Sequence, residues 1–210
     1  MLFKNGETIV FAGDSVTDAG RKRPIGEGLW EGVGNGYVRI IDSYLATEYP
    51  EQIIRCVNMG NSGDTSSALL ARWDTDVVSL NPDWVVLCIG FNDVWRQFDS
   101  PAQKEDAVLS ERFRANLNAM ADKTQSKMIW LTPYFIEPNK ADAMRKRMDE
   151  YGLIVKEEAA KRNILCIDLQ QAFDKFLTYR HSSYISWDRV HPSWVGNMII
   201  AREFLKNVKR

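Results

Sequence analysis

Short apolar runs that alternate with longer amphipathic stretches constrain the fold of this 210-residue chain more than any other feature. The runs are rich in Val and Ile and continuously apolar, which is typical of strands buried on both faces of a parallel sheet. We expect five such strands, at residues 8–12, 53–57, 84–89, 128–132 and 164–167.

Helical periodicity fills the intervals between these runs. Apolar residues recur at helical spacing after Gly36 and within 69–77, 144–159 and 198–208. Strands that alternate with helices predict a three-layer α/β/α sandwich around a parallel sheet. The chain has no internal repeat or linker and a length suited to one core, so residues 1–210 are expected to form a single domain.

Charge and hydropathy exclude several classes of function. The 27 basic and 28 acidic residues give a net charge of −1, so no basic surface for nucleic acid is expected. No apolar stretch approaches the roughly 18 residues of a membrane span, and the first residues do not resemble a signal peptide. We therefore expect a cytoplasmic protein with no membrane partner.

The positions of the three cysteines are also consistent with the expected cytoplasmic location. Cys56, Cys88 and Cys166 each lie in or beside an apolar run, which predicts buried, reduced thiols. A cysteine nucleophile or a metal site is disfavoured because there is no CxxC spacing and the chain has only two histidines.

Two segments lack regular periodicity and are expected to be loops. Residues 17–36 carry five glycines between positions 26 and 36 together with Arg21, Lys22 and Arg23, and residues 96–104 are the second such segment. The glycines do not form GxGxxG between a strand and a helix, which argues against dinucleotide binding.

A serine follows the first predicted strand, in Gly13-Asp14-Ser15. Because ligands of open α/β sheets bind at the carboxyl ends of the strands, Ser15 is placed to be a nucleophile. The alternative is that Ser15 or Asp14 only caps a helix. We expect Asp14 to order this loop through backbone amides, and not to bind a metal with Asp18.

Potential hydrogen-bond donors follow the next two strands. A backbone N–H at Gly63, with no side chain in the way, can donate to an oxyanion, and so can the side-chain amide of Asn92. Taken singly, Gly63 is better explained by a glycine turn with Asp64 or Thr65 as the helix cap, and Asn92 is equally explained as a turn residue.

An acid–histidine pair lies near the C-terminus. Asp188 and His191 are three residues apart before the last predicted helix, so the carboxylate can accept from Nδ1 and leave Nε2 for a hydroxyl. The other histidine, His181, is expected on the surface.

Together these blocks, GDSVTD, SGDT, GFND and DRVHP, resemble the SGNH hydrolases, also called GDSL lipases or esterases. Val16 stands where the family's name has Leu. The resemblance implies a flavodoxin-like fold with strand order 2-1-3-4-5. It also implies an oxyanion hole made of the N–H groups of Ser15 and Gly63 and the side chain of Asn92. No metal or organic cofactor is needed by such a serine hydrolase.

A finer resemblance concerns the substrate. EGLWEGVGNGYV, GFNDVWRQFD, MRKRMDEYG and WDRVHPS look like the intracellular acetylxylan-esterase branch of the family. This implies a carbohydrate O-acetylesterase for xylo-oligosaccharides that forms homo-oligomers. Trp30, Trp95 and Trp187 are candidates to stack on sugar rings, although each could instead pack in a core or an interface.

Other interpretations are open at this point. One is a broad short-chain acyl esterase, thioesterase or lysophospholipase of the same family. A more distant one is a non-catalytic binding module on a flavodoxin-like scaffold. Chain-length preference separates the first from an acetylesterase, and labelling of Ser15 excludes the second.

Overall fold

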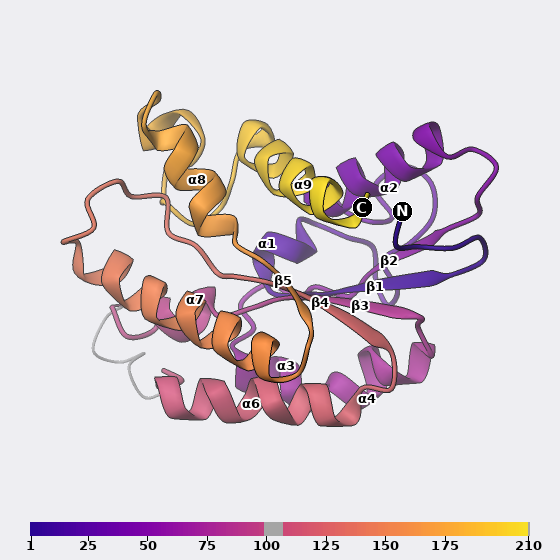
Figure 1. The fold of residues 1–210 in the computed structure, drawn as a ribbon, viewed down its shortest axis with the longest axis horizontal. Helices are drawn as coiled ribbons and strands as arrows, with labels where there is room; N and C mark the ends of the chain where they lie inside the picture. Colours follow the sequence, from indigo (N-terminus) through magenta and orange to yellow (C-terminus); the bar gives the residue numbers. More distant parts are fainter. Residues whose placement is uncertain (99–106, 210) are drawn as a thin grey trace.

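A five-stranded sheet forms the centre of the molecule (Figure 1). The computed structural model describes residues 1–98 and 107–209. All neighbouring strands run parallel, in the order β2-β1-β3-β4-β5, which confirms the predicted flavodoxin-like order. The strands are β1 (Thr8–Gly13), β2 (Arg55–Asn58), β3 (Trp84–Cys88), β4 (Lys127–Leu131) and β5 (Leu165–Ile167).

Helices cover both faces of this sheet, so the predicted three-layer sandwich is confirmed (Figure 1). One face carries α2 (Tyr37–Glu48), α8 (Leu169–Leu177) and α9 (Trp194–Val208). The other carries α3 (Ser66–Ala71), α4 (Trp73–Asp76), α6 (Ser110–Lys123) and α7 (Ala143–Lys161). The shorter elements are α1 (Ser15–Asp18), α5 (Phe91–Trp95), η1 (Val78–Leu80) and η3 (Ser182–Tyr184).

Burial on both faces explains why the strand sequences are continuously apolar. In β1, the segment from Ile9 to Ala12 is fully buried, and β3 is buried along its whole length. The second strand begins at Arg55 and not at residue 53 as predicted. Ile53 is 77% exposed and precedes the sheet, so its hydrophobicity is not a mark of the strand.

The helix expected over 69–77 is instead two short helices that meet at Arg72. Leu69, Trp73 and Val77 are fully inaccessible, as predicted, whereas Leu70 is only partly buried. The break places the Arg72 side chain beneath the carboxyl edge of the sheet, where its guanidinium donates to backbone carbonyls.

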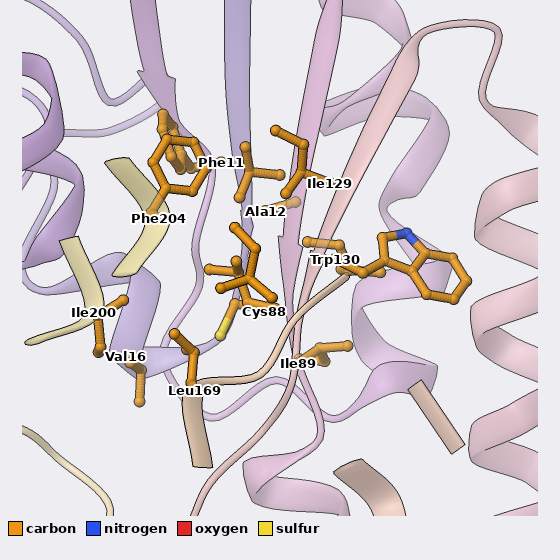
Figure 2. Close-up of a cluster of buried hydrophobic side chains, with 14 of the residues drawn as sticks. Phe11, Ala12, Val16, Cys88, Ile89, Ile129, Trp130, Leu169, Ile200 and Phe204 are labelled. Carbon is orange, nitrogen blue, oxygen red and sulfur yellow. The ribbon is translucent and has the colours of Figure 1, made fainter. Parts of the chain in front are cut away.

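The core packs the last helix against the first strand. Figure 2 shows Phe204 and Ile200 of α9 gathered with Phe11 of β1 and Val16 of α1, while the indole of Trp130 points away from this group. The ring centroids of Phe204 and Phe11 are 5.9 Å apart. The C-terminal helix therefore helps to support the strand that leads into Ser15.

The predictions for the cysteines and for the two loops agree with the structure only in part. All three thiols are free, and Cys56 and Cys88 are buried, but Cys166 is only partly buried because β5 is an edge strand. Residues 17–36 begin inside α1 and otherwise form no helix or named strand. Residues 99–104 of the second predicted loop lie outside the described residues.

No helix within residues 1–98 and 107–209 is both long and apolar enough to cross a membrane.

Replacing Phe204 by alanine should destabilise the protein by about 3–5 kcal/mol, because it leaves a cavity between α9 and β1. Urea unfolding measures this difference. Met198→Ala on the same helix is the control: its side chain is half exposed, so a change within about 0.5 kcal/mol is expected. Equal losses in both variants would contradict the proposed packing.

Candidate active site

The chain turns sharply between β1 and α1, and Ser15 is the first residue of that helix. Asp14 caps the helix, with its Oδ1 accepting from the N–H of Val16 at 3.1 Å. A Cβ at Gly13 would lie 2.3 Å from the carbonyl oxygen of Cys88, so only glycine fits. The capping interpretation and the nucleophile interpretation thus concern adjacent residues: Asp14 caps, and Ser15 is left partly exposed.

Ser15 and His191, which are 176 residues apart in the chain, meet at this corner. The Oγ of Ser15 lies 2.7 Å from Nε2 of His191, and Nδ1 of His191 lies 2.6 Å from Oδ2 of Asp188. A carboxylate can only accept, so Nδ1 carries the proton and Nε2 is free to accept from the serine hydroxyl. The structure therefore brings the three predicted residues into one hydrogen-bonded chain.

The second oxygen of Asp188 organises its own loop. Oδ1 accepts from the backbone N–H groups of Val190 at 2.9 Å and His191 at 2.8 Å, and from the hydroxyl of Ser186. Burial alone would raise the pKa of Asp188, but the hydrogen bonds from His191 and these amides outweigh it and hold the pKa below its ordinary value. The carboxylate is consequently kept ionised beside the imidazole.

The segment after β4 holds this loop in place. The N–H of Ile136 donates to the carbonyl of Arg189 at 2.8 Å, and the hydroxyl of Tyr134 donates to the carbonyl of Val190. Arg189 adopts a positive φ of 67° and pairs with Glu137. These contacts turn the backbone so that His191 faces β1.

Two of the three predicted oxyanion donors, Gly63 and Asn92, lie in the segments that follow β2 and β3. Gly63 has φ +88° with open space where a Cβ would be, so backbone conformation is what favours glycine here. One N–H of the Asn92 amide donates to the carbonyl of Asp64 at 2.9 Å. That bond fixes the plane of the amide.

Arg72 ties these loops together, and nothing in the sequence pattern indicated it. Its Nε donates to Asp64 at 2.6 Å, and its two terminal nitrogens donate to the carbonyls of Met59 and Gly13. Asn61 donates to the other oxygen of Asp64. The guanidinium thus joins the corner before Ser15 to the loop that carries Gly63.

Asn58 and Asp18 form a second network that the sequence interpretation missed. The amide of Asn58, fully buried at the end of β2, donates to the carbonyls of Thr17 and Val33. Asp18 accepts from the N–H of Ser62 at 2.9 Å and from Arg23 at 2.6 Å. A polar residue closing an apolar strand was the available signal for Asn58.

Asp14, which we expect from the sequence to order this loop, lies in a fully buried position. Its Oδ2 has no hydrogen-bond partner in the described part of the chain. Burial, together with the nearby charges of Asp93 and Asp64, raises the pKa of Asp14 well above its ordinary value, although the Val16 amide opposes this. Within residues 1–98 and 107–209, no cluster of three or more His, Cys, Asp or Glu side chains is arranged to hold a metal ion.

The three predicted tryptophans occupy different environments. The ring of Trp95 lies 5.8 Å from that of His191. Trp187 precedes Asp188 and is 90% exposed. Trp30, 79% exposed, lines a cavity of about 450 Å³ beside α2 and β2 whose walls include none of the triad residues. The structure therefore places two of the three next to the catalytic candidates.

Comparison with known proteins gives the family. The family described as GDSL-like Lipase/Acylhydrolase matches residues 11–199. The chain belongs to this family. The matched range includes all four of the sequence blocks from which the resemblance was drawn, and the chain is a carboxylic ester hydrolase of the family, as they predicted.

Close relatives cover the whole chain. An acetylxylan esterase from Geobacillus stearothermophilus is 45% identical over 211 residues, spanning 99% of this chain and 96% of the relative. The crystal structure of Axe2, an acetylxylan esterase from that organism, matches with a TM-score of 0.97 at 45% identity, over 100% of this chain and 97% of the other. Three catalytic mutants of Axe2, in which alanine replaces a serine, an aspartate or a histidine, also match this chain at 44% identity. Their TM-scores are 0.97, 0.97 and 0.98, and the matches cover 99–100% of this chain and 96–97% of theirs.

The Asp18 carboxylate should make stability depend on pH. Burial would raise its pKa, but Arg23 and the Ser62 amide hold the pKa of Asp18 below its ordinary value. The stabilisation is therefore present above about pH 4 and is lost as pH falls through the folded-state pKa. In Asp18→Asn, the loss of unfolding free energy on acidification should be smaller than in the wild type.

Urea unfolding between about pH 7 and pH 3 measures how steeply the free energy of unfolding falls with pH. Arg23→Gln removes the hydrogen-bonded cation among the groups that lower the pKa of Asp18. This variant should also lose less unfolding free energy on acidification than the wild type. A slope unchanged in both variants would mean that the Asp18 carboxylate is not the group responsible.

Proposed function

We propose that this protein is a serine ester hydrolase that removes acetyl groups from acetylated xylo-oligosaccharides through an acyl-enzyme on Ser15. The observation that carries the proposal is the hydrogen-bonded chain from the Oγ of Ser15 through the imidazole of His191 to Asp188. In this arrangement the serine hydroxyl is in contact with a base whose other nitrogen is held by a carboxylate.

Acylation begins when Ser15 attacks the ester carbonyl and His191 takes the hydroxyl proton at Nε2. The imidazolium that forms is stabilised by the ionised Asp188, whose low pKa keeps the charge on the carboxylate. The tetrahedral intermediate then collapses, the bond to the sugar oxygen breaks, and His191 gives its proton to the departing hydroxyl.

The oxyanion of the intermediate is proposed to lie among three donors. They are the backbone N–H groups of Ser15 and Gly63 and the side-chain amide of Asn92. Support comes from the position of all three at the carboxyl edge of the sheet and from the Asp64 carbonyl, which orients the Asn92 amide. Removal of one such preorganised donor lowers kcat by about 10²–10³-fold.

Deacylation repeats these steps with water as the nucleophile. His191 accepts a proton from water as the water oxygen attacks the acetyl carbonyl on Ser15. When the second tetrahedral intermediate collapses, the bond to Oγ breaks, His191 returns its proton to Oγ, and acetic acid leaves and ionises to acetate. No step needs a cofactor, because each proton and charge is handled by a side chain or a backbone amide already described.

The relatives support the choice of substrate. Axe2 is named an acetylxylan esterase and an acetyl-xylooligosaccharide esterase. Its catalytic aspartate and histidine are three positions apart, as Asp188 and His191 are here. A tryptophan variant of Axe2 concerns the residue directly before that aspartate, the position that Trp187 holds in this chain.

Aromatic side chains provide surfaces for a sugar. Trp187 is exposed beside Asp188, and Trp95 contacts His191, so both are proposed to border the leaving sugar. Trp30 lies farther along, at the cavity beside α2, and is proposed as a more distant substrate contact. Sugar rings stack on such aromatic faces through their apolar C–H surfaces.

We also propose that the protein works as a homo-oligomer in the cytoplasm. Leu29 and Trp30 project from one loop and are 82% and 79% exposed, a pattern typical of interfaces. The three free cysteines fit a reducing compartment. Sedimentation analysis would measure the assembly state.

Ser15→Ala should lower kcat on p-nitrophenyl acetate by about 10⁶-fold without loss of stability, because the residue is partly exposed. A fluorophosphonate should modify Ser15 in the wild type, as read by mass spectrometry. Ser79→Ala, a surface serine whose hydroxyl contacts only Thr75 in the described structure, is the control and should retain full activity and labelling. Absence of labelling would support the binding-module interpretation instead.

Acyl-chain preference tests the substrate. We expect acetylated xylo-oligosaccharides and p-nitrophenyl acetate to be hydrolysed with a higher kcat/KM than p-nitrophenyl octanoate, since each methylene that does not fit costs about tenfold or more. Measuring kcat/KM across the acyl series decides the point. Faster turnover of the octanoate would favour a broad acyl esterase, thioesterase or lysophospholipase.

A further inference from the structure

We propose that Asp93 is a positioning residue of the oxyanion hole, which acts through Ser66 to hold the Gly63 loop against the end of β3. The inference rests on the proposed function, because it concerns how two of the proposed donors are kept together. Asp93 directly follows Asn92, and Ser66 lies three residues after Gly63.

Three hydrogen bonds join the two residues. The backbone N–H of Ser66 lies 3.1 Å from Oδ1 and 2.9 Å from Oδ2 of Asp93, and the hydroxyl of Ser66 donates to Oδ1 at 2.5 Å. Both residues are fully buried. The hydroxyl of Ser66 also accepts from the amide of Asn116 on α6 at 2.9 Å, so the junction is supported from the layer beneath.

The hydrogen bond from Asn92 to the carbonyl of Asp64 is a second connection between the same two loops. Neighbouring residues on one side, Asn92 and Asp93, thus bind neighbouring parts of the other side, Asp64 and Ser66. Two such ties between the same pair of loops fix their relative orientation as well as their distance. The N–H of Gly63 and the amide of Asn92 would therefore be preorganised before substrate binds.

A carboxylate suits this position better than an amide. Both of its oxygens accept, and the bonds come from the N–H and O–H of one serine. Burial raises the pKa of Asp93 to about 6, although the Ser66 hydrogen bonds oppose the rise. Asp14 and Tyr151 also lie within electrostatic range of this carboxyl group. An asparagine would offer one accepting oxygen and turn an N–H₂ group toward donors.

The decisive measurement is kcat and KM of Asp93→Asn on p-nitrophenyl acetate. Misplaced donors weaken only the interaction with the oxyanion, which exists in the transition state and not in the bound ester. We therefore expect kcat to fall by up to about 10²-fold while KM stays within about twofold. A fold-only role for Asp93 predicts a lower unfolding midpoint and unchanged kcat for the folded protein.

Ser66→Ala provides a second, smaller change. It removes only the hydroxyl and should lower kcat in the same direction. If Asp93 acts through Ser66, the two losses will not add in the double variant Asp93→Asn/Ser66→Ala. Should Asp93→Asn fail to fold, the kcat of Ser66→Ala decides the question alone.

Asp168→Asn is the matched control. Asp168 also accepts from a helix N-terminal N–H, that of Gln171 in α8, and pairs with Lys156. In the part of the chain that the structure describes, no hydrogen bond or ion pair joins it to the oxyanion loops. It should lose stability while keeping the wild-type kcat. The inference is overturned if Asp93→Asn and Ser66→Ala, both folded, keep kcat within about twofold of the wild type.

The outcomes separate this inference from the proposed function. If the wild type hydrolyses p-nitrophenyl acetate and Ser15→Ala does not, the esterase assignment stands whatever Asp93→Asn does. A wild type that is inactive, or as active as Ser15→Ala, overturns the esterase assignment and this inference with it.

Discussion

The common direction of the five strands is the constraint on which the rest of this structure depends. Parallel strands end at the same edge, so residues that follow different strands are brought together without any sequence proximity. Ser15 follows β1, Gly63 follows β2 and Asn92 follows β3. The pair Asp188 and His191 reaches this edge through a loop anchored after β4. The candidate site is thus a product of topology before it is a product of any single contact.

Features that depend on local sequence were predictable. Apolar runs indicated the strands, and helical spacing indicated α2, α7 and α9, because burial imposes a period on each element. The bonds of Arg72, Asn58 and Asp93 were not predictable. Each joins segments that are distant in the chain, and only the folded arrangement determines which carbonyl or N–H such a side chain will meet.

Four buried or half-buried aspartates serve the site in different electrostatic states. Asp18 and Asp188 are held ionised, by Arg23 and a backbone amide in one case and by His191 and backbone amides in the other. Burial raises the pKa of Asp14 well above its ordinary value. Burial also raises the pKa of Asp93, but only to about 6, because the Ser66 hydrogen bonds favour the carboxylate. Residue type alone does not assign these states, since the surroundings of each carboxyl group decide its charge.

The loop of Asp188 and His191 carries a broader consequence. Its internal hydrogen bonds fix the imidazole tautomer, and its anchors lie on residues 134–137 and not on β1. The base and the nucleophile are therefore built as separate modules that share the bond between Oγ and Nε2. A small relative displacement of the two modules would uncouple them while each stays internally assembled, which makes that single bond a sensitive reporter of alignment across the sheet edge.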